Sequence, residues 1–121
     1  MDKIIINNLH IYAYHGVNEE EKRDGQNFYL DITAFLDASV PCVTDRVEDT
    51  VSYSAMIKKI VPAFTAEKYD LIEKAAQVVA DCVLDNFEKV QAVEVTLRKP
   101  EAPVKADFGY VAVQIRRERN G

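Results

Sequence analysis

The stretch FYLDITAFLD, residues 28–37, decides the fold class of this chain. Apolar side chains stand at every second position, at Phe28, Leu30, Ile32, Ala34 and Leu36, and alternate with Tyr29, Asp31, Thr33 and Asp37. Because neighbouring side chains of a strand point to opposite faces, this pattern predicts a β-strand with one face in the core.

A partner strand is expected on the N-terminal side, over residues 4–14, which are rich in β-branched and aromatic side chains. Its core face is predicted to carry Ile5, Leu9, Ile11 and Ala13. A polar stretch, residues 18–24, and then Gly25 separate the two segments. We therefore expect the two strands to form a hairpin.

Two further strands are predicted in the last third of the chain. Their alternating apolar residues are Val93, Val95 and Leu97 in one and Val111, Val113 and Ile115 in the other. A turn containing Pro100 and Pro103 lies between them. These strands are expected to form a second hairpin.

Two helices are predicted in the middle of the chain, after an aperiodic loop over residues 40–52. Their apolar stripes are Ile57, Ile60, Val61 and Phe64 in the first helix and Ile72, Ala75, Ala76, Val79, Cys82, Val83 and Phe87 in the second. Pro62 is expected to kink or shorten the first helix. Asp70 and Glu73 have the spacing of a capping box at the start of the second.

The predicted fold class is therefore α+β: a four-stranded antiparallel sheet with two helices on one face, in the order ββααββ. Residues 1–121 contain no linker-like stretch and are expected to form a single domain. The edge strands are long and unshielded, and the helix-free face carries Tyr12, Tyr14, Tyr29, Phe35 and Tyr110. These features predict edge-to-edge association into a homo-oligomer.

Composition excludes several classes of partner. A net charge of −5 opposes nucleic-acid binding, and the arginines at the C-terminal end, Arg116, Arg117 and Arg119, are interpreted as a solvated end. The apolar run near Met1 is too short for a signal peptide or a membrane span. Cys42 and Cys82 lack C-x-x-C spacing, so we expect reduced thiols and a cytoplasmic location.

Motifs for phosphate loops, dinucleotide binding and hydrolase elbows are absent from the sequence. His10 and His15 are an odd number of residues apart on a predicted strand, so they should face opposite sides and should not share a zinc ion. His15, next to Gly16, is interpreted as structural. Any chemistry is then expected from lysine, tyrosine and carboxylate side chains.

Four segments stand out along the chain. They are Tyr14-His15-Gly16 with Glu21 and Gly25-Gln26, then Thr44 to Tyr53, then Tyr69 to Glu73, and finally Val95 to Pro100 followed by Ala102-Pro103. Each string alone occurs by chance in many proteins. Together, in this order and on these elements, they resemble the dihydroneopterin aldolase family.

The resemblance implies the tunnelling fold, in which sheets from several subunits join edge to edge into a barrel. It implies a homotetramer or homo-octamer with active sites between neighbouring subunits. It also implies a pterin substrate, 7,8-dihydroneopterin, cleaved by a retro-aldol reaction. The dihydropterin ring already contains a C=N bond that accepts electrons, so neither a metal, a Schiff base nor a cofactor is expected.

The resemblance also assigns roles to individual residues. Glu73 is expected to bind the amino group and ring N–H of the pterin, with a further contact from the backbone of Ile72. Lys99 is the expected general acid and base. Tyr53 and Glu21 are expected to assist proton transfer and to contact the substrate, and Val51 is expected to contribute to binding.

Two alternatives stay open at this point. An epimerase acting on dihydroneopterin or its triphosphate can use the same retro-aldol intermediate, although a triphosphate favours a basic site and this chain is acidic. The chain could also be a non-catalytic module that binds pterins or other partners, since a fold does not determine a function.

Overall fold

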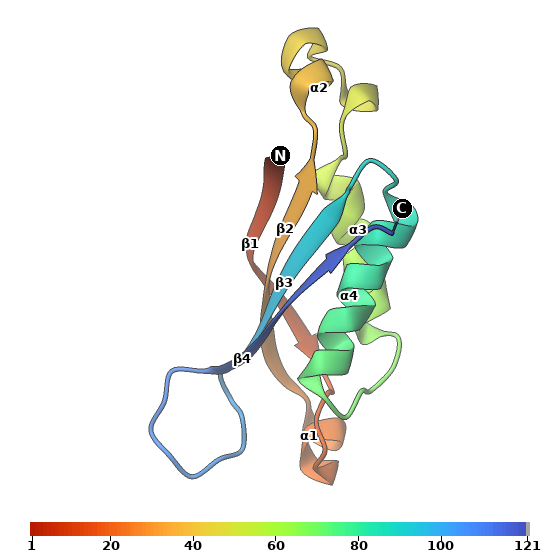
Figure 1. Cartoon of the computed structure of the whole chain (residues 1–121). Helices are drawn as coiled ribbons and strands as arrows, with labels where there is room; N and C mark the ends of the chain where they lie inside the picture. The colour runs from red at the N-terminus through yellow and green to blue at the C-terminus, as the bar shows by residue number, and fades with distance from the viewer. Residues whose placement is uncertain (121) are drawn as a thin grey trace.

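The computed structural model describes residues 1–120 and contains the predicted sheet and helices. The elements are β1 (Asp2–Ala13), α1 (Glu19–Asp24), β2 (Gln26–Leu36), α2 (Ser39–Thr44), the 3-10 helix η1 (Val47–Asp49), α3 (Tyr53–Thr65), α4 (Ile72–Asn86), β3 (Ala92–Lys99) and β4 (Val111–Glu118). The strands lie in the order β1-β2-β3-β4, and each neighbouring pair is antiparallel. Helices α3 and α4 cover one face, so the predicted fold class is confirmed (Figure 1).

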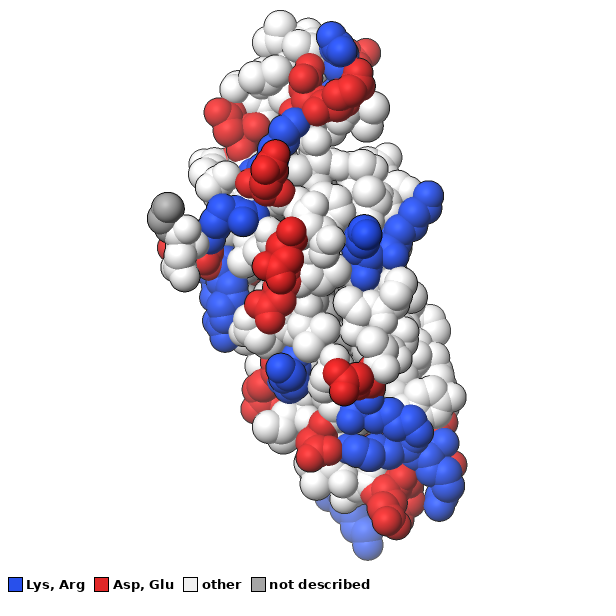
Figure 2. Space-filling view, turned by 90° about the vertical axis from the view of Figure 1, so that its right-hand side faces the viewer, with Lys and Arg blue, Asp and Glu red and all other residues white. Residues whose placement is uncertain are grey.

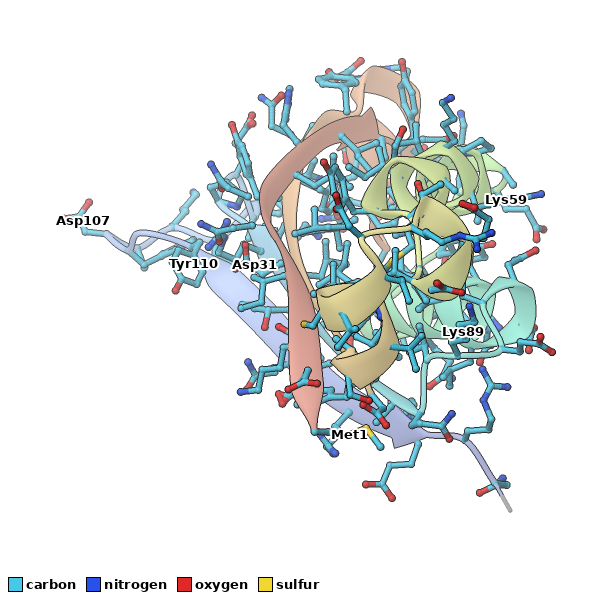
Figure 3. The ribbon with its side chains drawn as sticks, turned by 90° about the horizontal axis from the view of Figure 1, so that it is seen from above. Met1, Asp31, Lys59, Lys89, Asp107 and Tyr110 are labelled. Atoms are coloured by element: carbon cyan, nitrogen blue, oxygen red, sulfur yellow. The ribbon has the colours of Figure 1, made fainter. Side chains whose placement is uncertain are left out.

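The core lies between this sheet and the two helices. The alternating residues of β2, from Phe28 to Leu36, are all buried. They meet the buried side of the helices, which carries Met56, Ile60 and Phe64 from α3 and Ala75, Ala76, Val79, Ala80 and Val83 from α4. Viewed from above, Asp31 and Tyr110 project on the other side of the sheet from Lys59 and Lys89 (Figure 3). No helix within residues 1–120 is long and apolar enough to cross a bilayer.

A β-bulge changes the face assignment predicted for β1. Ile6 pairs with Ile32 but Leu9 pairs with Leu30, so β1 contains one extra residue between them. Asn8 lies within this bulge and has a φ of 61°. Its N–H donates a hydrogen bond to the carboxylate of Asp31 at 2.7 Å. The prediction that Ile5 shares the core face was wrong: Ile5 is 64% exposed, and Ile6 is buried instead.

The connections are more helical than predicted. The polar stretch over residues 18–24 contains α1, and the expected loop over residues 40–52 overlaps α2 and contains η1. Helix α3 continues for three residues beyond Pro62, so the proline does not end it there. Ser52 begins α3 by accepting a hydrogen bond from the Ala55 N–H.

The predicted capping box at the start of α4 does not form. Leu71 is the N-cap residue, and α4 begins at Ile72 without a side-chain cap. Asp70 instead pairs with Lys22, whose Nζ lies 2.5 Å from its carboxylate. Glu73 is thus the second helical residue, and its carboxylate is left free of a capping role.

The arginines at the end of β4 are also not simply solvated. Arg119 donates hydrogen bonds to the carbonyls of Leu84, Phe87 and Val90, at 2.7, 3.0 and 3.0 Å. Carbonyls at a helix C-terminus lack helical partners, so the guanidinium of Arg119 satisfies the carbonyls of Leu84 and Phe87 at the end of α4.

Candidate active site

A buried ion pair joins two of the predicted site residues. Lys99 ends β3, two residues after Leu97, and therefore points to the helix side of the sheet. Its Nζ lies 2.6 Å from Oε2 of Glu21, which is carried by α1. The two side chains are only 12% and 8% exposed. Helix α1, which the sequence pattern did not predict, is therefore what brings Glu21 to the lysine.

Further hydrogen bonds hold the Glu21 carboxylate in place. Gln26 Nε2 donates to Oε2 at 2.9 Å, and the Asn18 N–H donates to Oε1 at 3.3 Å. Burial alone opposes the charged carboxylate, but the hydrogen bonds from Lys99, Gln26 and Asn18 outweigh it and lower the pKa of Glu21. Glu21 is therefore an anion at neutral pH, held from three directions.

A cleft of about 330 Å³ lies beside this ion pair. It is lined by Val17, Asn18, Glu21, Asp70, Leu71, Ile72, Glu73, Lys99, Ala102, Pro103, Val104 and Val111. Glu73 is exposed and makes no hydrogen bond within residues 1–120, so its carboxylate is open to a ligand. The cleft thus has a lysine–glutamate wall and a second wall formed by the start of α4.

The lysines Lys22 and Lys68 near the cleft have hydrogen-bond partners. Figure 2, which looks onto the helical side, shows lysine and arginine side chains interspersed with aspartate and glutamate. Lys22 donates to the Gly16 carbonyl as well as to Asp70. Lys68 donates to the Lys22 carbonyl at 2.8 Å. Lys22 therefore supports the chain around the cleft and is not a free cation for a phosphate group.

The structure divides the predicted site residues into two groups. Glu21, Ile72, Glu73 and Lys99 line the one cleft, whereas Val51 and Tyr53 lie at the start of α3, towards the other end of the molecule (Figure 1). Helix α3 has 13 residues, which corresponds to a length of about 20 Å. Tyr53 is 65% exposed and Val51 is buried. Within one chain, these two residues do not meet the other four.

Sequence reasoning assigned no role to Gln26 or to the backbone of Gly16, although both stand in the matched segments. Gln26 is 95% buried, and its amide links Glu21 to the His15 carbonyl, which accepts at 3.3 Å. Gly16 lies directly against the Glu21 carboxylate. The Gly25-Gln26 pair was the signal available in the sequence, but only the folded chain shows which groups Gln26 contacts.

Replacing Gly16 with alanine should disturb the ion pair. A Cβ at this position would overlap the carboxyl carbon and both oxygens of Glu21, so the carboxylate would have to leave Lys99. Overpacking of this kind costs about 1–3 kcal/mol. We expect a lower melting temperature and reduced turnover, measured by thermal unfolding and by product formation. Wild-type values for both would contradict the close packing of Gly16 against Glu21.

Comparisons with known proteins show the family of the chain. The family model for dihydroneopterin aldolase matches residues 4–116. A Bacillus subtilis dihydroneopterin aldolase is 35% identical over 99% of this chain and 100% of the relative. A crystal structure of E. coli dihydroneopterin aldolase in complex with neopterin is 29% identical, with a TM-score of 0.88 over 97% of this chain and 99% of that one. The chain belongs to the dihydroneopterin aldolase family.

Proposed function

We propose that the chain cleaves 7,8-dihydroneopterin by a retro-aldol reaction, giving 6-hydroxymethyl-7,8-dihydropterin and glycolaldehyde in folate biosynthesis. The observation that carries this proposal is the buried Lys99–Glu21 pair, in the same cleft as the open carboxylate of Glu73. The neopterin in the E. coli structure supports a pterin as the ligand. The alternative of a non-catalytic module is not favoured, since the family relatives are named as aldolases.

Glu73 binds the pterin ring in this proposal. The ring presents an amino group and an N–H along one edge, and a carboxylate accepts both hydrogen bonds at once. Glu73 stands in the first turn of α4, where its position is set by the helix and its oxygens have no partner within residues 1–120. The backbone of Ile72, in the same turn and on the same cleft wall, adds a polar contact.

Lys99 moves the protons of the reaction. The 2′-hydroxyl of the side chain loses its proton, the C1′–C2′ bond breaks, and the electron pair moves into the ring C=N bond. A proton is then returned to C1′, and glycolaldehyde leaves. Lys99 exchanges protons among the hydroxyl, the ring and water, while Glu21 holds the amine at the position where these transfers occur.

Incubation with 7,8-dihydroneopterin tests the reaction. We expect glycolaldehyde and the hydroxymethyl pterin in equal amounts, measured by chromatography of the pterins and by trapping of the aldehyde. Rejoining of the two fragments would give the opposite configuration at C2′, so the same chromatogram reports a side activity as an epimerase. Absence of both products at high protein concentration, with an active relative as the positive control, would refute the proposed function.

Tyr53 and the backbone segment that carries Val51 contribute to the active site of a neighbouring copy. Their exclusion from the cleft of their own chain and the exposure of Tyr53 support this arrangement. The sheet edges β1 and β4 are the surfaces through which copies join into a tetramer or octamer with a closed barrel. The side chain of Tyr53 then hydrogen-bonds the hydroxyl of the substrate and shares in proton transfer.

Mixing two inactive variants tests the shared site. Lys99→Met and Tyr53→Ala each inactivate every site of a homo-oligomer, but random mixing restores both groups in about a quarter of the sites. We expect activity to appear after the two variants are unfolded together and refolded. Refolding of each variant alone is the control. A stable, active monomer in light scattering, or no regain of activity on mixing, would contradict a site shared between copies.

We further propose that the protein works in the cytoplasm. Its two cysteines, Cys42 and Cys82, are free thiols, which fits a reducing compartment. Fractionation of cells that express the tagged protein measures its location. Recovery outside the cytoplasmic fraction would contradict this assignment.

A further inference from the structure

His15 is fully buried, directly before Gly16, and the proposed chemistry does not use it. Its ring is enclosed by the aromatic rings of Phe28, Phe64 and Tyr69, with centroid distances of 5.4, 4.6 and 5.2 Å. An apolar side chain of similar size would fill this space without the cost of burying two ring nitrogens. The hydrogen bonds of the ring must therefore explain why an imidazole occupies this position.

Both ring nitrogens of His15 bind the backbone of distant residues. Nδ1 lies 3.0 Å from the Tyr69 amide nitrogen, and Nε2 lies 2.9 Å from the Phe64 carbonyl. Because the Tyr69 N–H is a donor, Nδ1 must accept, and the ring hydrogen must be on Nε2, where it donates to Phe64. The hydrogen bonds therefore select one neutral tautomer.

The residue after His15 binds the same peptide segment. The Gly16 N–H donates to the Tyr69 carbonyl at 2.9 Å, so residues 15 and 16 together hold both backbone groups of Tyr69. Tyr69 stands three residues before Ile72 and four before Glu73. On the other side, the His15 carbonyl accepts from Gln26, which also holds Glu21.

We propose that His15 is a positioning residue for pterin binding, which sets the start of α4 relative to the Lys99–Glu21 wall of the cleft. The proposal rests on the proposed function, because it concerns the pterin held between those walls. Removing the Nδ1 acceptor leaves the partly buried Tyr69 N–H without a partner and loosens the segment that carries Ile72 and Glu73. The backbone hydrogen bond from Gly16 to the Tyr69 carbonyl and the exposed ion pair of Lys22 with Asp70 then remain, and an exposed ion pair stabilises little on its own.

The ring must be neutral for this role. Burial lowers the pKa of His15 below its ordinary value of 6.5, and Lys22 of α1 and Lys99 of β3 act in the same direction, while the bond to the Phe64 carbonyl opposes them. Protonation would place a hydrogen on Nδ1, so that two donors would face each other and the hydrogen bond from the Tyr69 N–H would be lost. The stabilisation by neutral His15 is therefore complete above pH 6.5 and is lost as the pH falls through the lower pKa of the folded protein.

Two variants with amide side chains test the contributions of the two ring nitrogens of His15 separately. The side-chain oxygen of asparagine can take the position of Nδ1, so His15→Asn keeps the acceptor for Tyr69 and loses the bond to Phe64. His15→Gln reaches the position of Nε2, so it keeps the Phe64 bond and loses the acceptor. Titration with neopterin should give a dissociation constant for the Asn variant close to the wild-type value and one raised about tenfold or more for the Gln variant.

Turnover and stability complete the test. Because Lys99 and Glu21 are left in place, KM should rise in the Gln variant much more than kcat falls, although both variants are destabilised by a similar loss of one hydrogen bond. Equal affinities in the two variants, or losses of affinity that follow their melting temperatures, would overturn the proposal. A wild-type protein that binds no neopterin and releases no glycolaldehyde would instead refute the proposed function.

The pH dependence gives a readout that does not require the variants to fold. Neopterin affinity of the wild-type protein should weaken as the pH falls through the pKa of His15 in the folded protein, which lies below its ordinary value of 6.5. Where His15→Asn folds, its affinity should be flat over the same range. A wild-type affinity that is constant down to the acid unfolding transition would contradict the role of neutral His15.

Discussion

Replacement of Lys99 by methionine should lower turnover by about 10²- to 10⁴-fold, the usual contribution of a general acid–base group. Methionine keeps the apolar stem of the side chain and removes only the amine, so neopterin affinity should stay near the wild-type value. Single-turnover measurements and neopterin titration give the two quantities separately. An unchanged rate would remove Lys99 from the mechanism.

A second variant controls for damage to the fold. Lys99→Met leaves the buried Glu21 carboxylate without its cation, and breaking a buried pair in this way costs about 3–5 kcal/mol. Combining it with Glu21→Gln removes the unpaired charge, so the melting temperature should recover. Turnover should not recover, because the amine is still missing. Recovery of turnover in the double variant would show that Lys99 serves only to neutralise Glu21.

Replacement of Glu73 by alanine should mainly destroy binding. Two charge-assisted hydrogen bonds to the pterin are worth about 1.5–3 kcal/mol each, so the dissociation constant should rise by about 10²- to 10⁴-fold. Stability should change by less than about 1 kcal/mol, since Glu73 has no hydrogen-bond partner within residues 1–120 and contributes only its charge near a helix N-terminus. Neopterin titration and thermal unfolding measure these effects.

Glu20→Ala is the matched control for Glu73. Glu20 is an exposed carboxylate in the first turn of α1, next in sequence to Glu21 but outside the cleft lining. Its removal makes the same change in net charge and should leave the dissociation constant unchanged. Equal weakening in the two variants would mean that general electrostatics, and not Glu73 itself, attracts the pterin.

The regular parts of the fold could be predicted from local patterns. The alternation in β2 fixes which residues enter the core, and the apolar stripes of α3 and α4 fix their buried sides. The bulge at Asn8 could not be predicted, because it depends on contacts with Asp31 and Arg98 from other strands. A contact between residues that are distant in sequence does not change the local spacing of apolar residues from which the strands were predicted.

The sequence suggested which residues to consider for the candidate site, but not how they are arranged. The resemblance to a family singled out Glu73 and Lys99, and the chain places both at one cleft. The contact between Lys99 and Glu21 depends on how α1 folds against the end of β3, and α1 is too short to produce a helical pattern. The separation of Tyr53 from this group follows from the length and direction of α3, which no motif spacing contains.

The pairing of β2 with β3 has a consequence for folding kinetics. Each hairpin joins strands that are close in sequence. Strands β2 and β3, by contrast, are neighbours in the sheet but are separated in the sequence by α2, α3 and α4. Contacts between distant segments form late, because closing a long loop costs entropy before any contact repays it. Lys99–Glu21 and His15–Tyr69 both cross between the first hairpin and the rest of the chain. The ability to bind pterins should therefore appear with the last kinetic phase of refolding. A folding intermediate that lacks these contacts should not bind pterins.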